Sequence, residues 1–311
     1  MSSVVLGDKT APSRRRTGSP VRRREVIAAY CFAAPFFVLF LVFTVGPVIS
    51  SFAMSFTDLT SRDVRHPLSV NPVGIDNFTK LLHDDTFHQA VLNTVYFVVV
   101  GVPLGMVLSL AAAVALNTGI TRFRTFFRVS YYLPVVTSIV AISVVWRFLL
   151  EPDSGIVNTL LGYVGVDGPS WLQDQATAMP SLIVMGAWRN LGFLMVIFLA
   201  GLQTVPKEQL EAAAIDGAGA WNRFRYITLP ALRPTLLFGG VITTIGYLQF
   251  FEEPFVMTQG GPLDKTLSIA YYTYNQFGFG NYSYAAAMAY TLFLVIAVIT
   301  FIQFKLFGEK D

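Results

Sequence analysis

Three of the ionisable side chains that interrupt apolar stretches of the sequence could take part in chemistry. Arg189 lies inside one apolar run, and Glu252 and Glu253 lie near the end of another. A guanidinium in such a setting can donate hydrogen bonds to the hydroxyl or phosphate-like groups of a solute. The alternative is a structural ion pair between Arg189 and one of the two glutamates. For the glutamates, the alternatives are a water-facing pair at a helix end and an outer gate or solute contact.

Aromatic and amide side chains in the same runs could bind a polyhydroxylated ring. Trp188 offers an apolar face, Asn190 can hydrogen-bond hydroxyl groups, and Phe193 follows one helical turn later. Thr243 and Tyr247 are four residues apart, so they share one face of a helix. An aromatic stripe that only packs helices together would explain the same residues.

The sequence contains no arrangement typical of an enzyme. It has no G-x-x-x-x-G-K-[ST] phosphate-binding loop. His66, His83 and His88 do not form a ligand cluster with acids, and no nucleophile–base pair is apparent. The lone cysteine, Cys31, cannot form an intrachain disulfide. We therefore expect no catalytic residues, no metal site and no enzymatic activity of the chain by itself.

Composition places the polar residues named above in lipid-spanning helices. Of 311 residues, 54% are hydrophobic and 13% are charged, whereas soluble domains carry about 25% charged residues. A helix needs about 20 apolar residues to cross a bilayer core. The sequence predicts an all-α integral membrane protein with a basic, disordered tail at residues 1–27 and a transmembrane domain at 28–307. Its six spans are expected at about 28–56, 90–116, 129–150, 176–205, 235–258 and 285–304.

Lysine and arginine are distributed unequally over the predicted connections. Sixteen lie in the two tails and in the second and fourth connections, whereas four lie in the first and fifth. Positive residues stay on the cytoplasmic side, so both termini are predicted to be cytoplasmic. The net charge of +3 implies no nucleic-acid partner. The expected location is a bacterial-type inner membrane that the chain crosses several times.

The cytoplasmic connection at residues 203–234 has the most informative pattern. Residues 205–217 predict a short helix that ends at Gly217, which suits the left-handed conformation of a helix stop. Leu210 and Ala214 share a small, shallow face. Such a face suits docking into a partner's groove better than it suits a self-contained core. An amphipathic helix lying on the membrane is the alternative.

This connection resembles the EAA loop of ABC importer permeases. The matching residues are Glu211, Ala212, Ala213, Ala214, Ile215, Asp216, Gly217 and Ala218, followed by Phe224, Ile227, Leu229, Pro230 and Pro234. The resemblance implies the type I ABC importer permease fold, with a coupling helix that sits in a cleft of an ATPase subunit. Coupling would then rest on Glu211, Ala212, Ala213, Ile215, Asp216, Gly217 and Ala218.

The resemblance narrows to carbohydrate importers of the maltose and glycerol-phosphate type. Residues 257–262, Met-Thr-Gln-Gly-Gly-Pro, are similar to the outer turn in the first of their two permeases. The adjacent glutamates depart from that pattern, where an aromatic residue followed by aspartate is expected. The family's solute site would correspond to Trp188, Asn190, Phe193, Thr243, Tyr247 and Tyr131, close to Arg189.

The resemblance also implies partners and a function. The chain would be a permease subunit of an ATP-driven, binding-protein-dependent importer for a sugar or sugar-like solute. It would work with a second permease subunit, two copies of an ABC ATPase and an extracytoplasmic solute-binding protein. ATP and magnesium would bind the ATPase subunits, and this chain would hold no cofactor. Which sugar, polyol or glycerophosphodiester is carried, and whether this subunit or its partner holds it, stay open.

Two other functions fit parts of the sequence. An ion-coupled secondary transporter would need buried acids near the bilayer midplane and often contains inverted repeats. The predicted place of Glu252 and Glu253 is too far outward, and no internal repeat is apparent. A non-transporting membrane scaffold would not need Arg189 in the middle of the bilayer.

Overall fold

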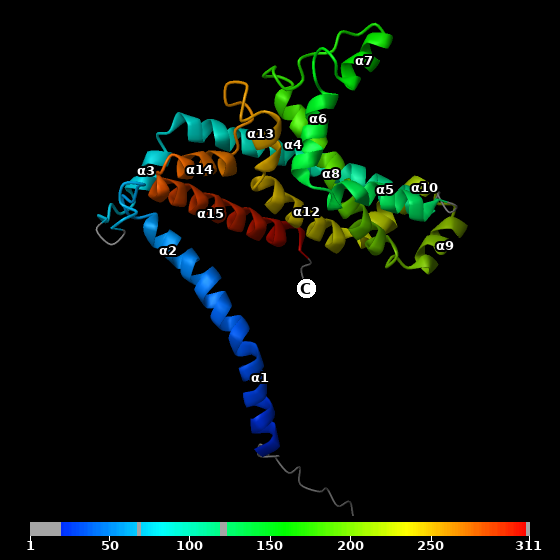
Figure 1. The fold of residues 1–311 in the computed structure, drawn as a ribbon. Helices are drawn as coiled ribbons and strands as arrows, with labels where there is room; N and C mark the ends of the chain where they lie inside the picture. Colours follow the sequence, from blue (N-terminus) through cyan, green and yellow to red (C-terminus); the bar gives the residue numbers. More distant parts are fainter. Residues whose placement is uncertain (1–19, 67–69, 119–122, 309–311) are drawn as a thin grey trace, which may run out of the picture. The chain divides into compact units, whose positions relative to one another are not determined.

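The computed structural model describes residues 20–66, 70–118 and 123–308, and the chain is helical through most of these ranges (Figure 1). An isolated bridge joins Thr57 and Pro72, and no strand forms within the described ranges. The chain divides into two compact units, Met1–Ser51 and Phe52–Asp311. Of the tail that was predicted to be disordered, residues 1–19 lie outside the described residues, and residues 20–27 are helical.

The N-terminal unit is a long helix with one widened turn. It consists of α1 (Pro20–Phe40), the π-helical turn η1 (Leu41–Val45) and the first part of α2 (Gly46–Met54). Pro47 has no amide hydrogen, and its ring crowds the carbonyl of Phe43 one turn earlier. The helix widens there, so that the Gly46 amide donates to the Leu41 carbonyl.

The second unit contains all the other helices. They are α3 (Asp76–Leu81), α4 (Asp85–Thr118), α5 (Arg124–Val136), α6 (Ile139–Leu149), α7 (Ile156–Tyr163), α8 (Ala178–Leu202), α9 (Lys207–Ile215), α10 (Ala220–Arg223), η2 (Phe224–Thr228), α11 (Leu229–Ala231), α12 (Arg233–Leu248), α13 (Glu252–Met257), α14 (Ile269–Gly278) and α15 (Tyr282–Phe307).

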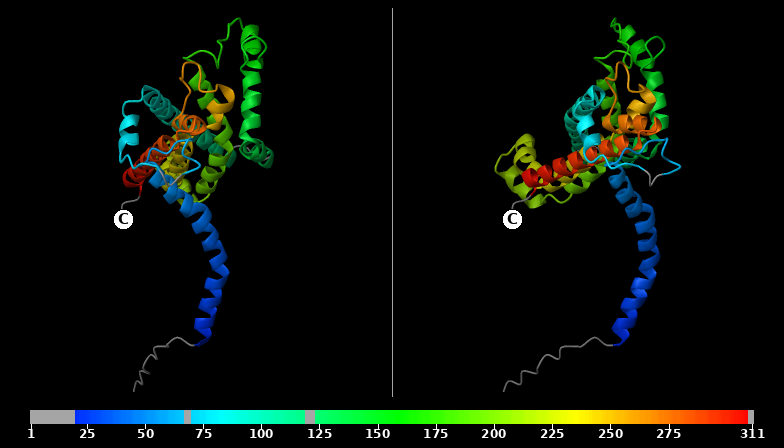
Figure 2. Two further views of the ribbon diagram at one scale, coloured as in Figure 1. Left: turned by 60° about the vertical axis from the view of Figure 1, so that its left-hand side comes forward. Right: turned by 90° about the vertical axis from the view of Figure 1, so that its left-hand side faces the viewer.

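Helices α4, α8 and α12 form the centre of this unit. They pack against one another, α5 lies along α8, and α15 lies along α12 and α14 (Figure 2). Side chains from α4 and α8 fill the space between them, and Phe97, Leu182, Met185, Leu194 and Phe198 are fully buried. The central helices can therefore hold polar residues at fixed positions.

Four helices are long and apolar enough to cross a membrane within the described ranges: Arg24–Met54, Asp85–Asn117, Ala178–Leu202 and Tyr282–Phe307. Two further pairs pass the same test but are bent, Thr125–Val136 with Ile139–Leu149 by 100° and Ala220–Ala231 with Arg233–Leu248 by 68°. The described chain therefore has between four and six candidate spans.

The stretch predicted as the third span bends between α5 and α6. Pro134 lacks the amide that would bond to the preceding turn. The Thr137 hydroxyl donates to the Leu133 carbonyl at 2.8 Å, and the Thr137 backbone is extended. Side-chain bonding of this kind competes with the helical ladder and favours a break there.

The stretch predicted as the fifth span, 235–258, consists of two helices in the structure. Helix α12 ends at Leu248, and α13 begins at Glu252. Pro254 would crowd the Phe250 carbonyl in a continuous helix and cannot bond to it. The Ser268 hydroxyl donates to that carbonyl instead, at 2.7 Å. The break places Glu252 and Glu253 on α13 and not on α12.

Candidate functional site

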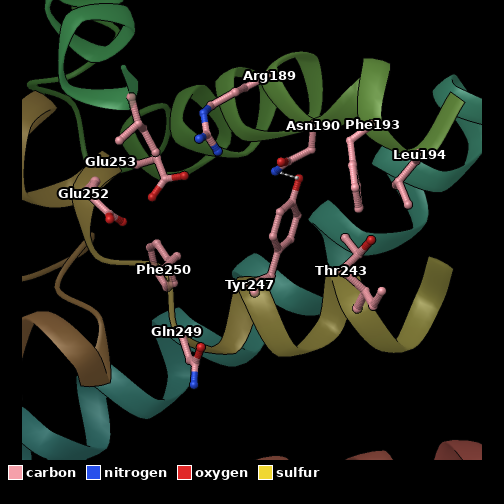
Figure 3. A pocket seen from close by; sticks show the side chains of 13 residues that line it. Arg189, Asn190, Phe193, Leu194, Thr243, Tyr247, Gln249, Phe250, Glu252 and Glu253 are labelled. Atoms are coloured by element: carbon pink, nitrogen blue, oxygen red, sulfur yellow. Dashed lines mark hydrogen bonds between the residues drawn. The ribbon is translucent and has the colours of Figure 1, made fainter. Parts of the chain in front are cut away.

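A cavity of about 240 Å³ lies between α8, α12 and α13, with one contribution from α6 (Figure 3). Its wall includes five residues singled out from the sequence as possible solute contacts: Arg189, Asn190, Phe193, Thr243 and Tyr247. Both possible gate residues, Glu252 and Glu253, also line it. The structure thus brings together residues that are more than fifty positions apart.

Packing and a hydrogen bond hold the Tyr247 side chain in the cavity wall. Its ring is buried and packs on Phe97 with the ring centroids 4.9 Å apart. The Asn190 amide donates to the Tyr247 hydroxyl at 3.5 Å. Gly101 on α4 leaves the room for this ring, because a Cβ there would lie 2.8 Å from Tyr247 Cε2. Packing against α4 therefore fixes the position of the Tyr247 hydroxyl in the cavity wall.

Arg189 and Glu253 reach into the same part of the cavity from different helices (Figure 3). Glu253 is only 5% exposed, and its Oε2 atom has no hydrogen-bond partner. The Nε atom of Arg189 is also buried without a partner. No nitrogen–oxygen approach within 4.0 Å joins Arg189 to Glu252 or Glu253, both of which are described. The structure therefore does not contain the ion pair considered from the sequence.

The two glutamates differ from each other. Glu252 is exposed, as a water-facing residue should be, whereas Glu253 is buried. The interpretation of a water-facing pair fits only Glu252. Both side chains nevertheless border the cavity.

Two of the expected solute contacts lie outside the cavity wall. Trp188 faces Trp146 of α6, with the ring centroids 5.7 Å apart. Tyr131 on α5 stacks on Phe127, with the ring centroids 6.4 Å apart. Both side chains take part in contacts between aromatic rings and are partly exposed.

Sequence reasoning missed six residues of the cavity wall. They are Ile139, Leu194, Ile242, Gly246, Gln249 and Phe250. Three of them could have been found, because Ile242, Gly246 and Gln249 repeat at helical spacing beside Thr243 and Tyr247. Phe250 lies beyond the end of α12, and it reaches the wall by stacking on Phe97 with a 4.0 Å centroid separation.

The loop between α8 and α12 contains α9, whose end has the predicted geometry. Gly217 has φ +83°, in the left-handed region that glycine adopts at little cost. The Ala218 amide donates to the Ala213 carbonyl at 2.8 Å, and the Gly217 amide donates to the Ala214 carbonyl at 3.1 Å. These two bonds close the helix in the manner of a Schellman motif.

Helix α9 exposes the residues that match the EAA pattern. Ile215 is 87% exposed, and Glu211, Ala212, Asp216 and Gly217 are exposed as well. Ala213 and Ala218 are partly buried. Helix α9 thus presents most of its EAA-type residues, Ile215 among them, on its exposed surface.

Outside the cavity, a second polar cluster lies where α4, α14 and α15 meet. Asp84 accepts hydrogen bonds from the hydroxyls of Tyr272 at 2.8 Å and Tyr284 at 2.6 Å. Partial burial opposes ionisation of Asp84, but these bonds and backbone amides outweigh it and lower the pKa of Asp84. Burial and the bond to Asp84 raise the pKa of Tyr272 to about 12. This carboxylate has the partners that Glu253 lacks.

The helical arrangement, the polar cavity between helices and the exposed α9 together define a membrane transport component. The family described as binding-protein-dependent transport system inner membrane component matches residues 101–308. The chain belongs to this family, whose members form the membrane-spanning part of ABC importers and are not themselves enzymes.

Similar proteins cover nearly the whole chain. The lactose transport system permease protein LacF of Rhizobium radiobacter is 37% identical over 298 residues, which are 94% of this chain and 98% of LacF. A solved bacterial ABC transporter involved in the import of the acidic polysaccharide alginate matches with a TM-score of 0.75 and 26% identity, over 90% of this chain and 94% of that one.

A second solved structure contains a bacterial alginate ABC transporter in complex with a periplasmic protein that holds an alginate pentasaccharide. It matches with a TM-score of 0.77 and 25% identity, over 90% of this chain and 93% of that one. No group of three or more His, Cys, Asp or Glu side chains that could hold a metal gathers in the part of the chain that is described.

Proposed function

We propose that this permease imports a sugar or sugar-like solute and that α9 couples it to ATP hydrolysis on separate subunits. The observation that carries the proposal is the exposed α9, with its EAA-type residues and its open Ile215. An exposed helix that carries the EAA-type residues suits a protein partner, and a nucleotide-hydrolysing subunit is the partner that the resemblance implies. LacF and the alginate transporters support a saccharide cargo.

The proposed assembly contains a second permease, two ATPase copies with their ATP and magnesium, and an extracytoplasmic binding protein. In the proposed arrangement, both termini lie in the cytoplasm, and each bent pair counts as one of six spans in a bacterial inner membrane. The lysines and arginines of the connections support this orientation. The binding protein that accompanies one solved relative supports the external partner.

In the proposed transport cycle, movement of α9 changes the shape of the cavity. Closure of the ATPases would move α9, which lies in the connection between α8 and α12. Both of those helices line the cavity, so their displacement would open it to one side of the membrane or the other. Net import requires that the two states bind solute differently and that ATP drives their exchange.

Purified complexes test the proposal. The chain is coexpressed with its partners, and ATP-dependent uptake into proteoliposomes and copurification of the ATPase are measured. Glu211→Lys and Gly217→Pro should abolish both, because one reverses a charge on α9 and the other forbids its left-handed stop. Uptake that persists without ATP and follows a proton gradient would refute the proposal in favour of ion coupling.

A further inference from the structure

The cavity wall contains two unsatisfied charged groups of opposite kind. Glu253 offers a buried acceptor oxygen without a donor, and Arg189 offers a buried N–H without an acceptor. A buried polar atom without a partner costs about 1–3 kcal/mol, and more when the group is charged. Asp84, by contrast, has two tyrosine hydroxyls on its carboxylate. Among the described carboxylates, the buried oxygen without a partner is that of Glu253, whereas unpartnered buried Nε atoms also occur on Arg128 and Arg223 outside the cavity.

A solute group that both donates and accepts hydrogen bonds would satisfy the Glu253 oxygen and the Arg189 N–H together. A hydroxyl can donate to the Glu253 oxygen and accept from Arg189, and adjacent hydroxyls on a ring can do so at once. A carboxylate on the solute could only accept, and would face Glu253. An ammonium could only donate, and would face Arg189. Neither charged group satisfies both sides of the pair.

The charge balance of the cavity wall points the same way. Its charged residues are one guanidinium, on Arg189, and two carboxylates, on Glu252 and Glu253. Two like charges about 4 Å apart repel by about 4 kcal/mol at an effective dielectric constant near 20. The other polar side chains in the wall, Asn190, Thr243, Tyr247 and Gln249, are neutral. An anionic solute that approached Arg189 would also meet the two glutamate side chains.

We propose that Glu253 and Arg189 set the specificity of this permease for a neutral, hydroxyl-rich saccharide and against one that carries carboxylates. This inference rests on the proposed function, in which the cavity holds the transported solute. Family membership does not decide the matter, because one relative is named for lactose and another imports an acidic polysaccharide.

Direct binding to the complete transporter tests the inference. The complex of this chain with its second permease and ATPases is purified without the binding protein, so that the permease alone selects. Binding of neutral probes (lactose, maltose and trehalose) and acidic probes (digalacturonate and lactobionate) is measured by saturation-transfer NMR and competition. At least one neutral probe should bind about tenfold more tightly than either acidic probe, a difference that one charge-assisted hydrogen bond can supply.

Matched variants locate the source of the preference. Glu253→Gln keeps the shape of the side chain and should reduce the preference for the neutral probe about tenfold. Glu252→Gln removes the same charge from the exposed neighbour and should reduce it less. Arg189→Gln should weaken the neutral probe without improving the acidic ones. Copurification of the ATPases verifies that each variant is folded.

Three results would overturn the inference: no neutral probe binds, an acidic probe binds as tightly as the best neutral one, or Glu252→Gln and Glu253→Gln act equally. The last would mean that net charge selects and the buried oxygen does not. Because ATPase copurification and ATP hydrolysis are measured on the same samples, a coupled complex that prefers acidic probes would refute only this inference. A complex that never forms would refute the proposed function.

Discussion

Helix α9 and the cavity are both incomplete, in opposite senses. Helix α9 holds an apolar side chain, Ile215, in the open, whereas the cavity holds polar atoms of Arg189 and Glu253 away from partners. Exposed apolar surface is relieved by another protein, and buried polar atoms are relieved by a polar ligand. This difference fits the proposed roles, in which α9 binds another subunit and the cavity binds a solute.

Helix α9 and the cavity also keep their shapes by different interactions. Helix α9 is closed by local bonds around Gly217, within six residues of chain. The cavity wall is held by tertiary packing, as with Tyr247 against Phe97 and Gly101. Substitutions that disturb packing should therefore lower stability and distort the cavity. Substitutions on α9 should leave stability unchanged and weaken binding of the partner subunit.

The largest effect is expected for Gly192→Ala in α8. A Cβ at this position would overlap the backbone carbonyl of Tyr131, where α5 packs on α8. The backbone cannot rotate aside like a side chain, so the substitution should cost about 3 kcal/mol in stability. Thermal unfolding of the purified chain in detergent measures it. Gly162→Ala, whose Cβ would meet nothing within 4 Å, serves as the control. Equal unfolding temperatures for the two variants would contradict the claim that close packing at Gly192 stabilises the fold.

Ile215→Asp should leave the unfolding temperature of the chain unchanged and weaken its binding to the ATPase subunit. Loss of a central apolar contact typically costs about 2 kcal/mol of binding, so affinity for the ATPase subunit should fall more than tenfold. Biolayer interferometry with the purified ATPase measures this. Val164→Asp changes a similarly open side chain, 73% exposed, in the segment after α7. If the two variants lose the same affinity, α9 is not a specific contact.

Gly101→Ala probes the packing behind the cavity more gently. Its Cβ would press on the edge of the Tyr247 ring at 2.8 Å, which an aromatic side chain can relieve by shifting. We expect a loss of about 1–2 kcal/mol in stability and weaker solute binding. Gly105→Ala on the same helix would reach only the Tyr247 hydroxyl, at 3.7 Å, and should be nearly neutral. Unfolding and probe binding are compared for the two; indistinguishable results would show that Tyr247 is not held from α4.

Asp84→Asn should have the smallest effect on stability. It tests a carboxylate that has hydrogen-bond partners, unlike Glu253. The pKa of Asp84 is lowered in the fold, so its contribution to stability is present above the ordinary carboxyl pKa of 3.8 and is lost as pH falls through the lower folded value. At pH 7 the variant should lose about 1 kcal/mol, since the carboxylate is partly exposed.

Unfolding of wild type and Asp84→Asn at pH 7, 5 and 3 measures this linkage. The gap between them should be similar at pH 7 and 5 and smaller at pH 3. Asp85→Asn, at the exposed neighbouring carboxylate, should show a smaller gap throughout. A gap for Asp84→Asn that grows on acidification would contradict the assigned hydrogen bonds.

The sequence predicts the helical class and the helix stop at Gly217 well, because both depend on local signals. Apolar runs mark helices by composition, and Gly217 marks a helix stop by its own conformational freedom. The break before Pro254 could also have been foreseen from the residue itself. Predicting a single helix over 235–258 overlooked that proline.

The cavity is predicted only in part, because its wall forms through contacts between distant helices. Residues on shared helix faces, such as Asn190 and Thr243, are indicated by spacing. The burial of Glu253 is not, because it depends on how α13 turns after the break and packs on α6 and α8. Trp188 and Tyr131 lie outside the wall for the same reason: their contacts are with Trp146 and Phe127.

Photo-crosslinking from position 215 tests whether α9 contacts an ATPase subunit. A photoreactive phenylalanine analogue replaces Ile215 in the full complex in membranes, with the same replacement at Val164 as a control. We expect the analogue at position 215 to attach to the nucleotide-hydrolysing subunit and the one at 164 not to do so. Attachment at 215 to lipid alone, or equal attachment from both positions, would contradict it.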